Sequence, residues 1–233
     1  MKNVLLASTS TLYGEEYLDY LLPELSGFFA GVSEIVFIPF ARPGGISHDD
    51  YTEKVRETFA TIGIKVCGLH RYSNPETAIA EAEGFFTGGG NTFLLVQQLH
   101  NSNLMEVLKQ KVESGIPYLG TSAGSNIGGL NMKNTNDMPI VYPPDFTTMG
   151  LVPFNINAHY LDPDPASTHN GETRETRIKE FHVFNDTPVV GLREGSWVRV
   201  KDSLVTTEGS KSSRIFLAGM EPYELESGSQ LKF

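Results

Sequence analysis

The first half of the chain alternates between short apolar runs and longer segments in which apolar residues recur at helical spacing. The short runs predict buried strands at 3–8, 34–40, 64–70, 83–89 and 116–122. The longer segments predict helices at 14–29, 47–63, 74–83 and 91–115. In the second of these helices, Tyr51, Val55 and Phe59 form an apolar stripe, which indicates a helix packed on a core.

Strands that alternate with helices indicate β-α-β crossovers and a parallel sheet. We therefore expect an α/β fold of three layers, with a mostly parallel sheet flanked by helices. The less regular second half predicts a strand in 154–160, a helix in 170–184 and antiparallel edge strands in 187–209 and 213–219. His169, at the start of that helix, is expected to be a capping or surface residue. No repeat or linker interrupts the pattern, so we expect a single α/β domain over residues 1–233.

Charge and cysteine content narrow the classes of function. The 233 residues carry a net charge of −10, and no Lys/Arg-rich run stands out, so we expect no nucleic-acid partner. A single cysteine, Cys67, excludes an internal disulfide and favours a cytoplasmic location, and its apolar surroundings predict a buried packing role. The apolar run within the first ten residues is shorter than the one that a signal peptide needs. No apolar run in the sequence is long enough to span a membrane.

Residues 120–124 read Gly-Thr-Ser-Ala-Gly after an apolar strand, and they predict a sharp strand-to-helix turn. Such a turn exposes the hydroxyl of Ser122 at the carboxyl edge of the sheet, where parallel sheets bind their ligands. The amide of Ala123 would then point toward a developing oxyanion. The five-residue pattern alone also fits a glycine-rich turn in which Ser122 caps a helix, and the apolar run before it and the small residues after it add to the case for a nucleophile.

A nucleophilic serine needs a base and a group that orients the base. Among six histidines, His159 ends an apolar run and is expected at the same sheet edge as Ser122. Asp137 and Glu194 are the two acids that could orient it. The order and spacing of these residues do not fit an α/β-hydrolase.

The glycine run at 88–90 follows another predicted strand. Its amides could cradle a phosphate, but the spacing of a dinucleotide or P-loop motif is absent. We favour a second oxyanion donor, Gly89 or Gly90, beside Ala123. No His-Glu-x-x-His motif or Cys/His cluster occurs, so we expect no metal and no cofactor.

In the helix expected at 170–184, Arg174 and Arg177 share a face with apolar residues. A buried guanidinium needs a partner, and Arg174 in the first turn also opposes the helix dipole. A bound carboxylate would relieve both costs. A structural ion pair with Glu172 or another acid is the alternative.

The chain carries, between residues 35 and 197 and in this order, the stretches VFIPFA, GGGNTF, GTSAGSN, TNDMPIV, INAHY, GETRETRI and GLREGSW. As an ordered set they resemble the peptidase E family, the α-aspartyl dipeptidases of the class I glutamine-amidotransferase-like group. The resemblance implies that Ser122 is the nucleophile and His159 the base. It implies Asp137 or Glu194 as the third member and leaves that choice open. It also implies cytoplasmic hydrolysis, without a metal, of small peptides that begin with aspartate.

The sequence therefore predicts a serine-type Asp-X dipeptidase, with Arg174, Arg177 and Glu172 at the substrate. Its rivals are an amidase or cyanophycinase-like hydrolase on the same fold, and a non-catalytic ligand-binding module. A homodimer is a further expectation.

Overall fold

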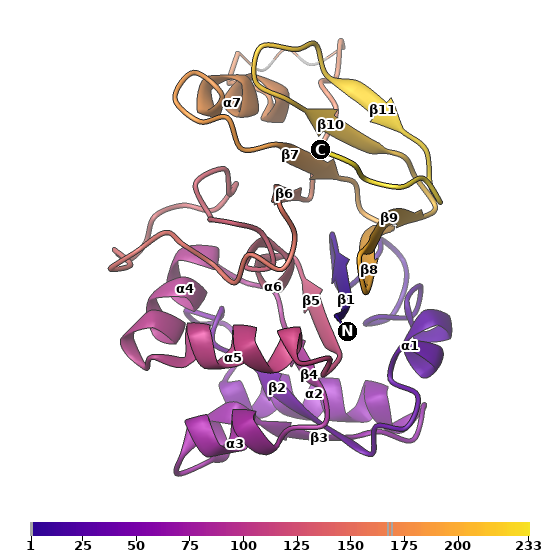
Figure 1. Ribbon diagram of the computed structural model, residues 1–233, viewed down its shortest axis with the longest axis vertical. Helices are drawn as coiled ribbons and strands as arrows, with labels where there is room; N and C mark the ends of the chain where they lie inside the picture. The colour runs from indigo at the N-terminus through magenta and orange to yellow at the C-terminus, as the bar shows by residue number, and fades with distance from the viewer. Residues whose placement is uncertain (1, 167, 169) are drawn as a thin grey trace.

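The computed structural model describes residues 2–166, 168 and 170–233, so His169 lies outside the described residues. A seven-stranded sheet occupies the lower part of the molecule in Figure 1, and a four-stranded sheet lies above it. The strand order is β3-β2-β4-β5-β1-β8-β9 in the larger sheet and β11-β10-β7-β6 in the smaller.

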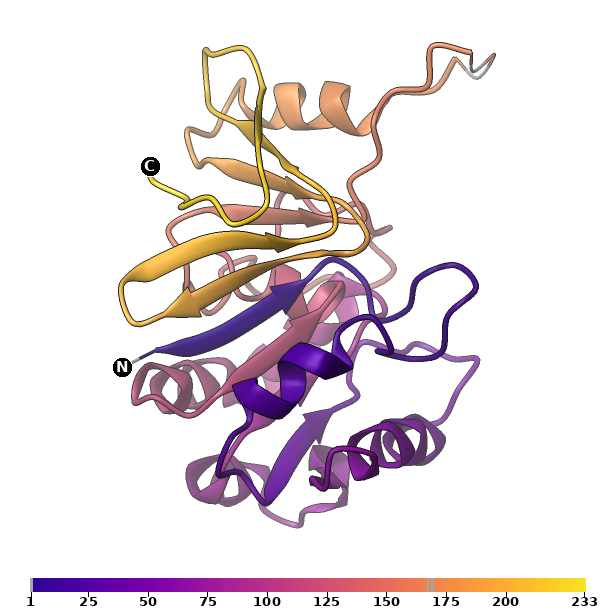
Figure 2. The same cartoon turned by 90° about the vertical axis from the view of Figure 1, so that its right-hand side faces the viewer.

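The larger sheet is parallel through its first five strands and ends in an antiparallel hairpin. This arrangement confirms the predicted three-layer α/β fold with antiparallel edge strands. Figure 2 shows the β8–β9 hairpin lying along β1. The strands of this sheet are β1 (Asn3–Ala7), β2 (Glu34–Ile38), β3 (Lys65–Gly68), β4 (Phe85–Thr87), β5 (Tyr118–Thr121), β8 (Ser196–Lys201) and β9 (Leu204–Gly209).

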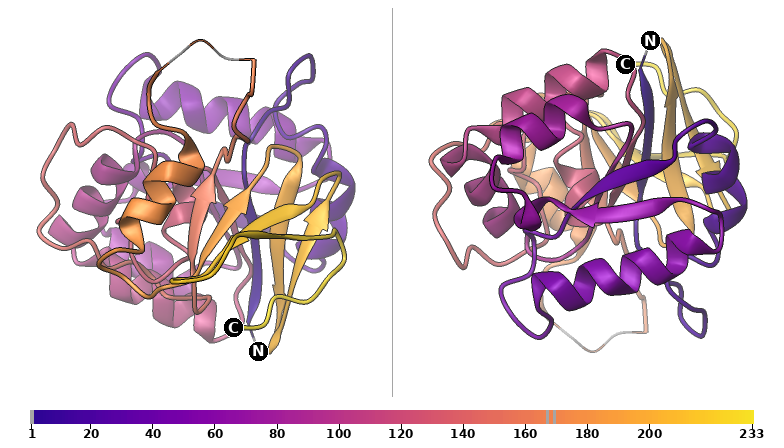
Figure 3. Two further views of the ribbon diagram at one scale, coloured as in Figure 1. Left: turned by 90° about the horizontal axis from the view of Figure 1, so that it is seen from above. Right: turned by 90° about the horizontal axis from the view of Figure 1, so that it is seen from below.

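Helices cover both faces of this sheet, as the view from below shows (Figure 3, right). One face packs on α1 (Leu22–Phe28) and α2 (His48–Ala60), whose buried residues include the predicted Tyr51, Val55 and Phe59. The other face packs on α3 (Pro75–Glu81), α4 (Thr92–Asn101), α5 (Leu104–Glu113) and α6 (Ala123–Asn126). A short 3₁₀ turn, η1 (Leu69–Arg71), follows β3.

Three local expectations were wrong in detail. The first helix begins at Leu22 rather than at residue 14, and Pro23 lies in its first turn, where a missing N–H costs least. The predicted helix 91–115 is two helices, because Asn103 adopts a left-handed φ of 54° between them. Cys67 is only half-buried, at the open edge of the sheet on β3.

The smaller sheet was not predicted as a separate sheet. It consists of β6 (Asn155–Ala158), β7 (Val189–Leu192), β10 (Ser213–Phe216) and β11 (Tyr223–Leu225). Only β6 and β7 are parallel to each other. Helix α7 (Arg174–Phe181) lies beside this sheet (Figure 3, left) and buries Ile178 against Val189 and Phe216.

Candidate active site

Ser122 lies on a strained turn between β5 and α6. Its φ of 53° and ψ of −113° fall outside the common regions for a residue with a side chain. Such a conformation costs on the order of 1–3 kcal/mol and persists only when the surroundings impose it. Here the Ser122 N–H donates to the carbonyl of Ala7 at the end of β1. The hydroxyl makes no capping bond to α6, so the helix-cap alternative does not describe it.

The two glycines of the motif are required by close contacts. A Cβ on Gly120 would lie 2.4 Å from the carbonyl oxygen of Gly124. A Cβ on Gly124 would lie 2.1 Å from the carbonyl oxygen of Thr87 at the end of β4. Both positions therefore exclude any larger residue, and together they allow the sharp turn that presents Ser122.

The Ser122 hydroxyl contacts His159, which contacts Glu194 in turn. His159 Nε2 lies 2.9 Å from Ser122 Oγ, and His159 Nδ1 lies 2.7 Å from Glu194 Oε1. The adjacency of His159 and Glu194 follows from the sheet, because Ala158 on β6 is the parallel partner of Leu192 on β7. When Nδ1 carries the proton and donates it to Glu194, Nε2 is free to accept the hydroxyl proton of Ser122.

Ser8, directly after β1, connects the two sheets at this point. Its buried hydroxyl accepts the backbone N–H of His159 at 2.9 Å and donates to the carbonyl of Leu192 at 2.6 Å. His159 itself adopts a left-handed φ of 55°. The end of β1 therefore contacts both the backbone of Ser122, through Ala7, and the backbone of His159, through Ser8.

Asp137 lies at the start of α4 rather than beside the imidazole. Its Oδ2 accepts the N–H of Thr92 at 2.7 Å and the hydroxyl of Thr135 at 3.2 Å. Within the described residues, Asp137 makes no hydrogen bond to His159. A carboxylate at a helix N-terminus is stabilised by the helix dipole, so this position is favourable for Asp137.

The glycine run after β4 lies against the serine. A Cβ on Gly89 would be 3.1 Å from the Cβ of Ser122. Gly90 has a φ of +151°, and a Cβ there would be 2.2 Å from the carbonyl oxygen of Ala41. Ala123, the other candidate donor, is the first residue of α6. The backbone of both segments thus borders the hydroxyl of Ser122.

A cavity of about 350 Å³ opens beside the imidazole. A second cavity, of about 470 Å³, adjoins α7 and the segment that follows β6. Arg174, the first residue of α7, lines both. Burial and the nearby Arg177 lower the pKa of Arg174, while Asp137 acts in the opposite direction. No carboxylate in the described part of the chain lies within 4 Å of the Arg174 guanidinium.

The other predicted substrate residues behave differently. Arg177 and Glu172 both line the second cavity and lie 3.6 Å apart, which matches the ion-pair alternative for these two. Both side chains are more than half exposed, so the pair contributes little to stability. Arg174 is therefore the member of the set that has no acidic partner among the described residues.

Sequence reasoning missed three residues of this region, namely Ser8, Arg193 and Lys211. Arg193 donates to both oxygens of Asp162 and both oxygens of Glu224, and these bonds raise its pKa. Its place between β7 and Glu194 is the signal that could have identified it. Lys211 lines the cavity beside His159 and Glu194, but it lies 52 residues after His159 in a segment with no motif.

The comparison with known families decides the relationship. The profile of peptidase family S51 matches residues 4–207. The chain belongs to this family.

Relatives along the whole chain agree with the S51 assignment. The protein named "Peptidase E" of Streptomyces coelicolor is 48% identical over 229 residues, which cover 98% of this chain and 93% of the relative. The protein named "Probable alpha-aspartyl dipeptidase" of Drosophila melanogaster is 41% identical and covers 100% of this chain and 97% of its own length. The predicted resemblance to the peptidase E group is confirmed.

The fold is shared with a solved structure of a peptidase from an acI-B1 Actinobacterium. The TM-score is 0.73 at 17% identity, over 100% of this chain and 97% of that one. None of the helices in residues 2–166, 168 and 170–233 is long and apolar enough to cross a membrane. The same residues contain no group of three or more His, Cys, Asp or Glu side chains suited to a metal ion.

Proposed function

We propose that this S51 peptidase is a serine-type dipeptidase that hydrolyses peptides with an N-terminal aspartate. The observation that carries the proposal is the continuous chain from Ser122 through His159 to Glu194, with contacts of 2.9 and 2.7 Å. These distances are within the reach that proton transfer requires. Relatives named for aspartyl dipeptidase and peptidase E activity support the substrate class.

In this mechanism, Ser122 Oγ attacks the carbonyl carbon of the N-terminal aspartyl residue while His159 Nε2 accepts the hydroxyl proton. Amides of Gly89 or Gly90 and of Ala123 stabilise the oxyanion of the tetrahedral intermediate. The intermediate collapses when His159 returns the proton to the leaving amine, and the C–N bond breaks. Water then hydrolyses the ester on Ser122 and releases aspartate.

Glu194 is the acid that we assign to orienting the imidazole. Its contact with Nδ1 supports this role, whereas the hydrogen bonds of Asp137 to Thr92 and Thr135 support a structural one. Arg174 binds the aspartyl side chain. Its position on the cavity beside His159 and its lack of an acidic partner among the described residues support that choice.

A serine-reactive fluorophosphonate probe tests the proposal together with a panel of Asp-X, Asn-X and longer peptides. We expect labelling in the wild type and none in Ser122→Ala. Asp-X dipeptides should be preferred over both other classes, which separates this activity from an amidase or a cyanophycinase-like hydrolase. Absence of labelling in the correctly folded wild type would instead favour a ligand-binding module.

The two acids are separated by matched amide substitutions. Glu194→Gln should lower kcat by several orders of magnitude, because an orienting carboxylate is worth about 10⁴ in related triads. Asp137→Asn should lower kcat by less than about tenfold. Equal losses in the two variants would contradict the assignment.

Three further features belong to the proposal. The chain forms a single domain, acts in the cytoplasm and assembles as a homodimer. The single cysteine supports a reducing compartment. Sedimentation of the purified protein measures the oligomeric state.

The proposed mechanism uses no metal. Treatment with EDTA should therefore leave the activity intact.

A further inference from the structure

Four cationic side chains line the two cavities near His159. Two of them lie beside carboxylates, and the other two do not. Arg193 is bound by Asp162 and Glu224, and Arg177 lies beside Glu172. Arg174 and Lys211 have no carboxylate within 4 Å in the part of the chain that the structure describes. Both of these line the 350 Å³ cavity that also contains His159. The cavity therefore offers two cations that have no carboxylate within 4 Å among the described residues.

The backbone holds Lys211 next to Glu194, the acid assigned to orienting the imidazole. Lys211 lies in the turn between β9 and β10, and its carbonyl accepts the hydroxyl of Ser196 at 2.9 Å. The preceding residue, Ser210, donates its N–H to the carbonyl of Gly195 at 2.9 Å. Gly195 directly follows Glu194, so these bonds hold the turn close to the imidazole and its carboxylate. The side chain itself is exposed and can reorient toward a ligand.

The proposed reaction needs two anion sites. An Asp-X dipeptide carries one carboxylate on the aspartyl side chain and one at its C-terminus. His159 Nε2 protonates the leaving nitrogen, so the leaving residue must lie next to the imidazole. In a dipeptide, the terminal carboxylate is separated from that nitrogen by a single Cα. It therefore falls within or at the rim of the cavity that His159 lines.

We propose that Lys211 binds the C-terminal carboxylate of the leaving residue, while Arg174 binds the aspartyl side chain. This inference rests on the proposed dipeptidase function and adds a second subsite to it. A longer peptide presents a neutral amide at the position of that carboxylate. Lys211 therefore favours dipeptides over longer peptides by charge, in addition to any limit set by shape.

The test compares Asp-Leu with its C-terminal amide, Asp-Leu-NH₂. The wild type should show a higher kcat/KM for the free acid by about tenfold or more, the lower end for a hydrogen bond to a charged group. Lys211→Met should bring this ratio close to one, mainly through the KM for the acid. Lys211→Arg keeps a cation and should retain most of the preference.

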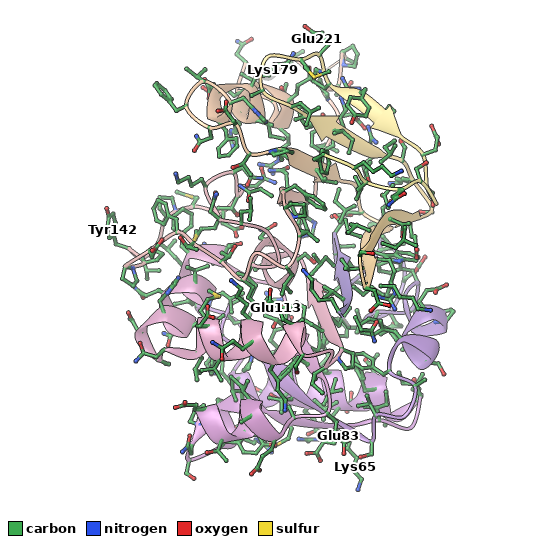
Figure 4. All side chains as sticks on the ribbon, in the orientation of Figure 1. Lys65, Glu83, Glu113, Tyr142, Lys179 and Glu221 are labelled. Atoms are coloured by element: carbon green, nitrogen blue, oxygen red, sulfur yellow. The ribbon has the colours of Figure 1, made fainter. Side chains whose placement is uncertain are left out.

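Two further variants make the result specific. Lys65→Met removes an exposed lysine at the far end of the molecule (Figure 4) and should leave the acid-to-amide ratio unchanged. Arg174→Met should abolish the preference for Asp-Leu over Asn-Leu while the acid-to-amide ratio persists.

An unchanged acid-to-amide ratio in Lys211→Met overturns the inference and leaves the dipeptidase proposal standing. If Arg174→Met brings the acid-to-amide ratio close to one and Lys211→Met leaves it unchanged, Arg174 binds the C-terminal carboxylate. That result also overturns the inference. If the wild type hydrolyses no Asp-X substrate, the proposed function fails and the inference fails with it.

Discussion

Ser122 and His159 face each other from backbone conformations that L-residues seldom adopt, with φ angles of 53° and 55°. Each such conformation stores strain, and hydrogen bonds in the surroundings must maintain it. Both residues receive these bonds from the end of β1, because Ala7 accepts the N–H of Ser122 and Ser8 accepts the N–H of His159. The geometry of the site at this scale depends on two adjacent residues, Ala7 at the end of β1 and Ser8 directly after it.

Replacing Ser8 with alanine should therefore affect catalysis as well as stability. The substitution leaves the N–H of His159 without its acceptor, and it leaves the carbonyl of Leu192 with the N–H of Tyr160 as its remaining donor. We expect a loss of about 1–3 kcal/mol in the free energy of unfolding. We also expect kcat to fall by about tenfold or more, because His159 is no longer held against Ser122. Urea denaturation and steady-state kinetics measure the two effects.

Ser213→Ala is the matched control, since Ser213 is equally buried and its hydroxyl bonds only to Thr207 within the described residues. It should lose stability with kcat unchanged. If both variants keep full activity, Ser8 does not position the base.

The sequence could predict Ser122 and not Ser8 for a physical reason. The turn around Ser122 is specified by glycines two residues away on either side, which a local pattern reveals. The partners of Ser8 lie 151 and 184 residues further along the chain. The residues next to a serine at the end of a strand contain no sequence pattern that predicts such distant contacts.

Among the elements, α7 is attached to the smaller sheet by a network of ions as well as by Ile178. Glu175 on α7 pairs with Lys179 and Arg214, and Arg214 shares Glu224 with Arg193. Arg193 reaches Asp162 in the segment after β6. The network therefore joins α7, the strands β10 and β11, and the residues that border the cavities.

Acid should weaken this network in a defined range of pH. Hydrogen bonds from Arg193, Ser212 and Arg214 lower the pKa of Glu224 from its ordinary value of 4.5 to about 2. A depressed pKa in the folded state stabilises the protein above the unfolded pKa, and that stabilisation disappears as the pH falls toward about 2. Glu224→Gln should lower the Tm at pH 7, and its difference from the wild type should shrink between pH 4.5 and 2. Circular dichroism at several pH values measures this. A difference that stays constant with pH would contradict it.

Boundaries of elements were harder to predict than their existence. The residues at 91–115 have an almost unbroken helical pattern, yet Asn103 interrupts it because asparagine tolerates a left-handed backbone. The apolar residues of 14–21 are buried in turns before α1, where Tyr17, Leu18 and Leu21 fill the core without forming a helix. Periodicity reports which residues are buried, and the chain can bury them in more than one conformation.

At the scale of the molecule, the site lies between two sheets. Ser122 and the glycine run belong to the larger sheet, whereas His159, Glu194 and Arg174 belong to the smaller sheet and its helix. One apolar cluster continues across both, from Val4 and Phe85 to Ile156 and Ile215. A shared core predicts that the two sheets unfold together.

A urea titration tests this expectation. The fluorescence of Trp197, the only tryptophan and a residue of the larger sheet, should change at the same midpoint as the far-UV circular dichroism and the peptidase activity. Activity that is lost at clearly lower urea than the other two signals would show that the junction opens first, and it would also argue against a single domain.

The division into two sheets could not have been predicted from the strands alone. The alternation of apolar and polar residues in 187–219 indicates strands, but it does not determine which strands pair with one another. The chain assigns β8 and β9 to one sheet and β7, β10 and β11 to the other. The resemblance to a known family predicted the site across this division because the family motifs come from both sheets.

The position of β1 between β5 and β8 has a consequence for the order of synthesis. A ribosome makes β1 first, but the strand that completes its second side is made nearly 200 residues later, and Glu194 arrives just before it. Until then, the chain of contacts from Ser122 through His159 to Glu194 is incomplete. One edge of β1 also stays open to other chains. A nascent peptidase of this architecture therefore lacks Glu194 for most of its translation, and during that interval the edge of β1 that β8 later covers stays unpaired.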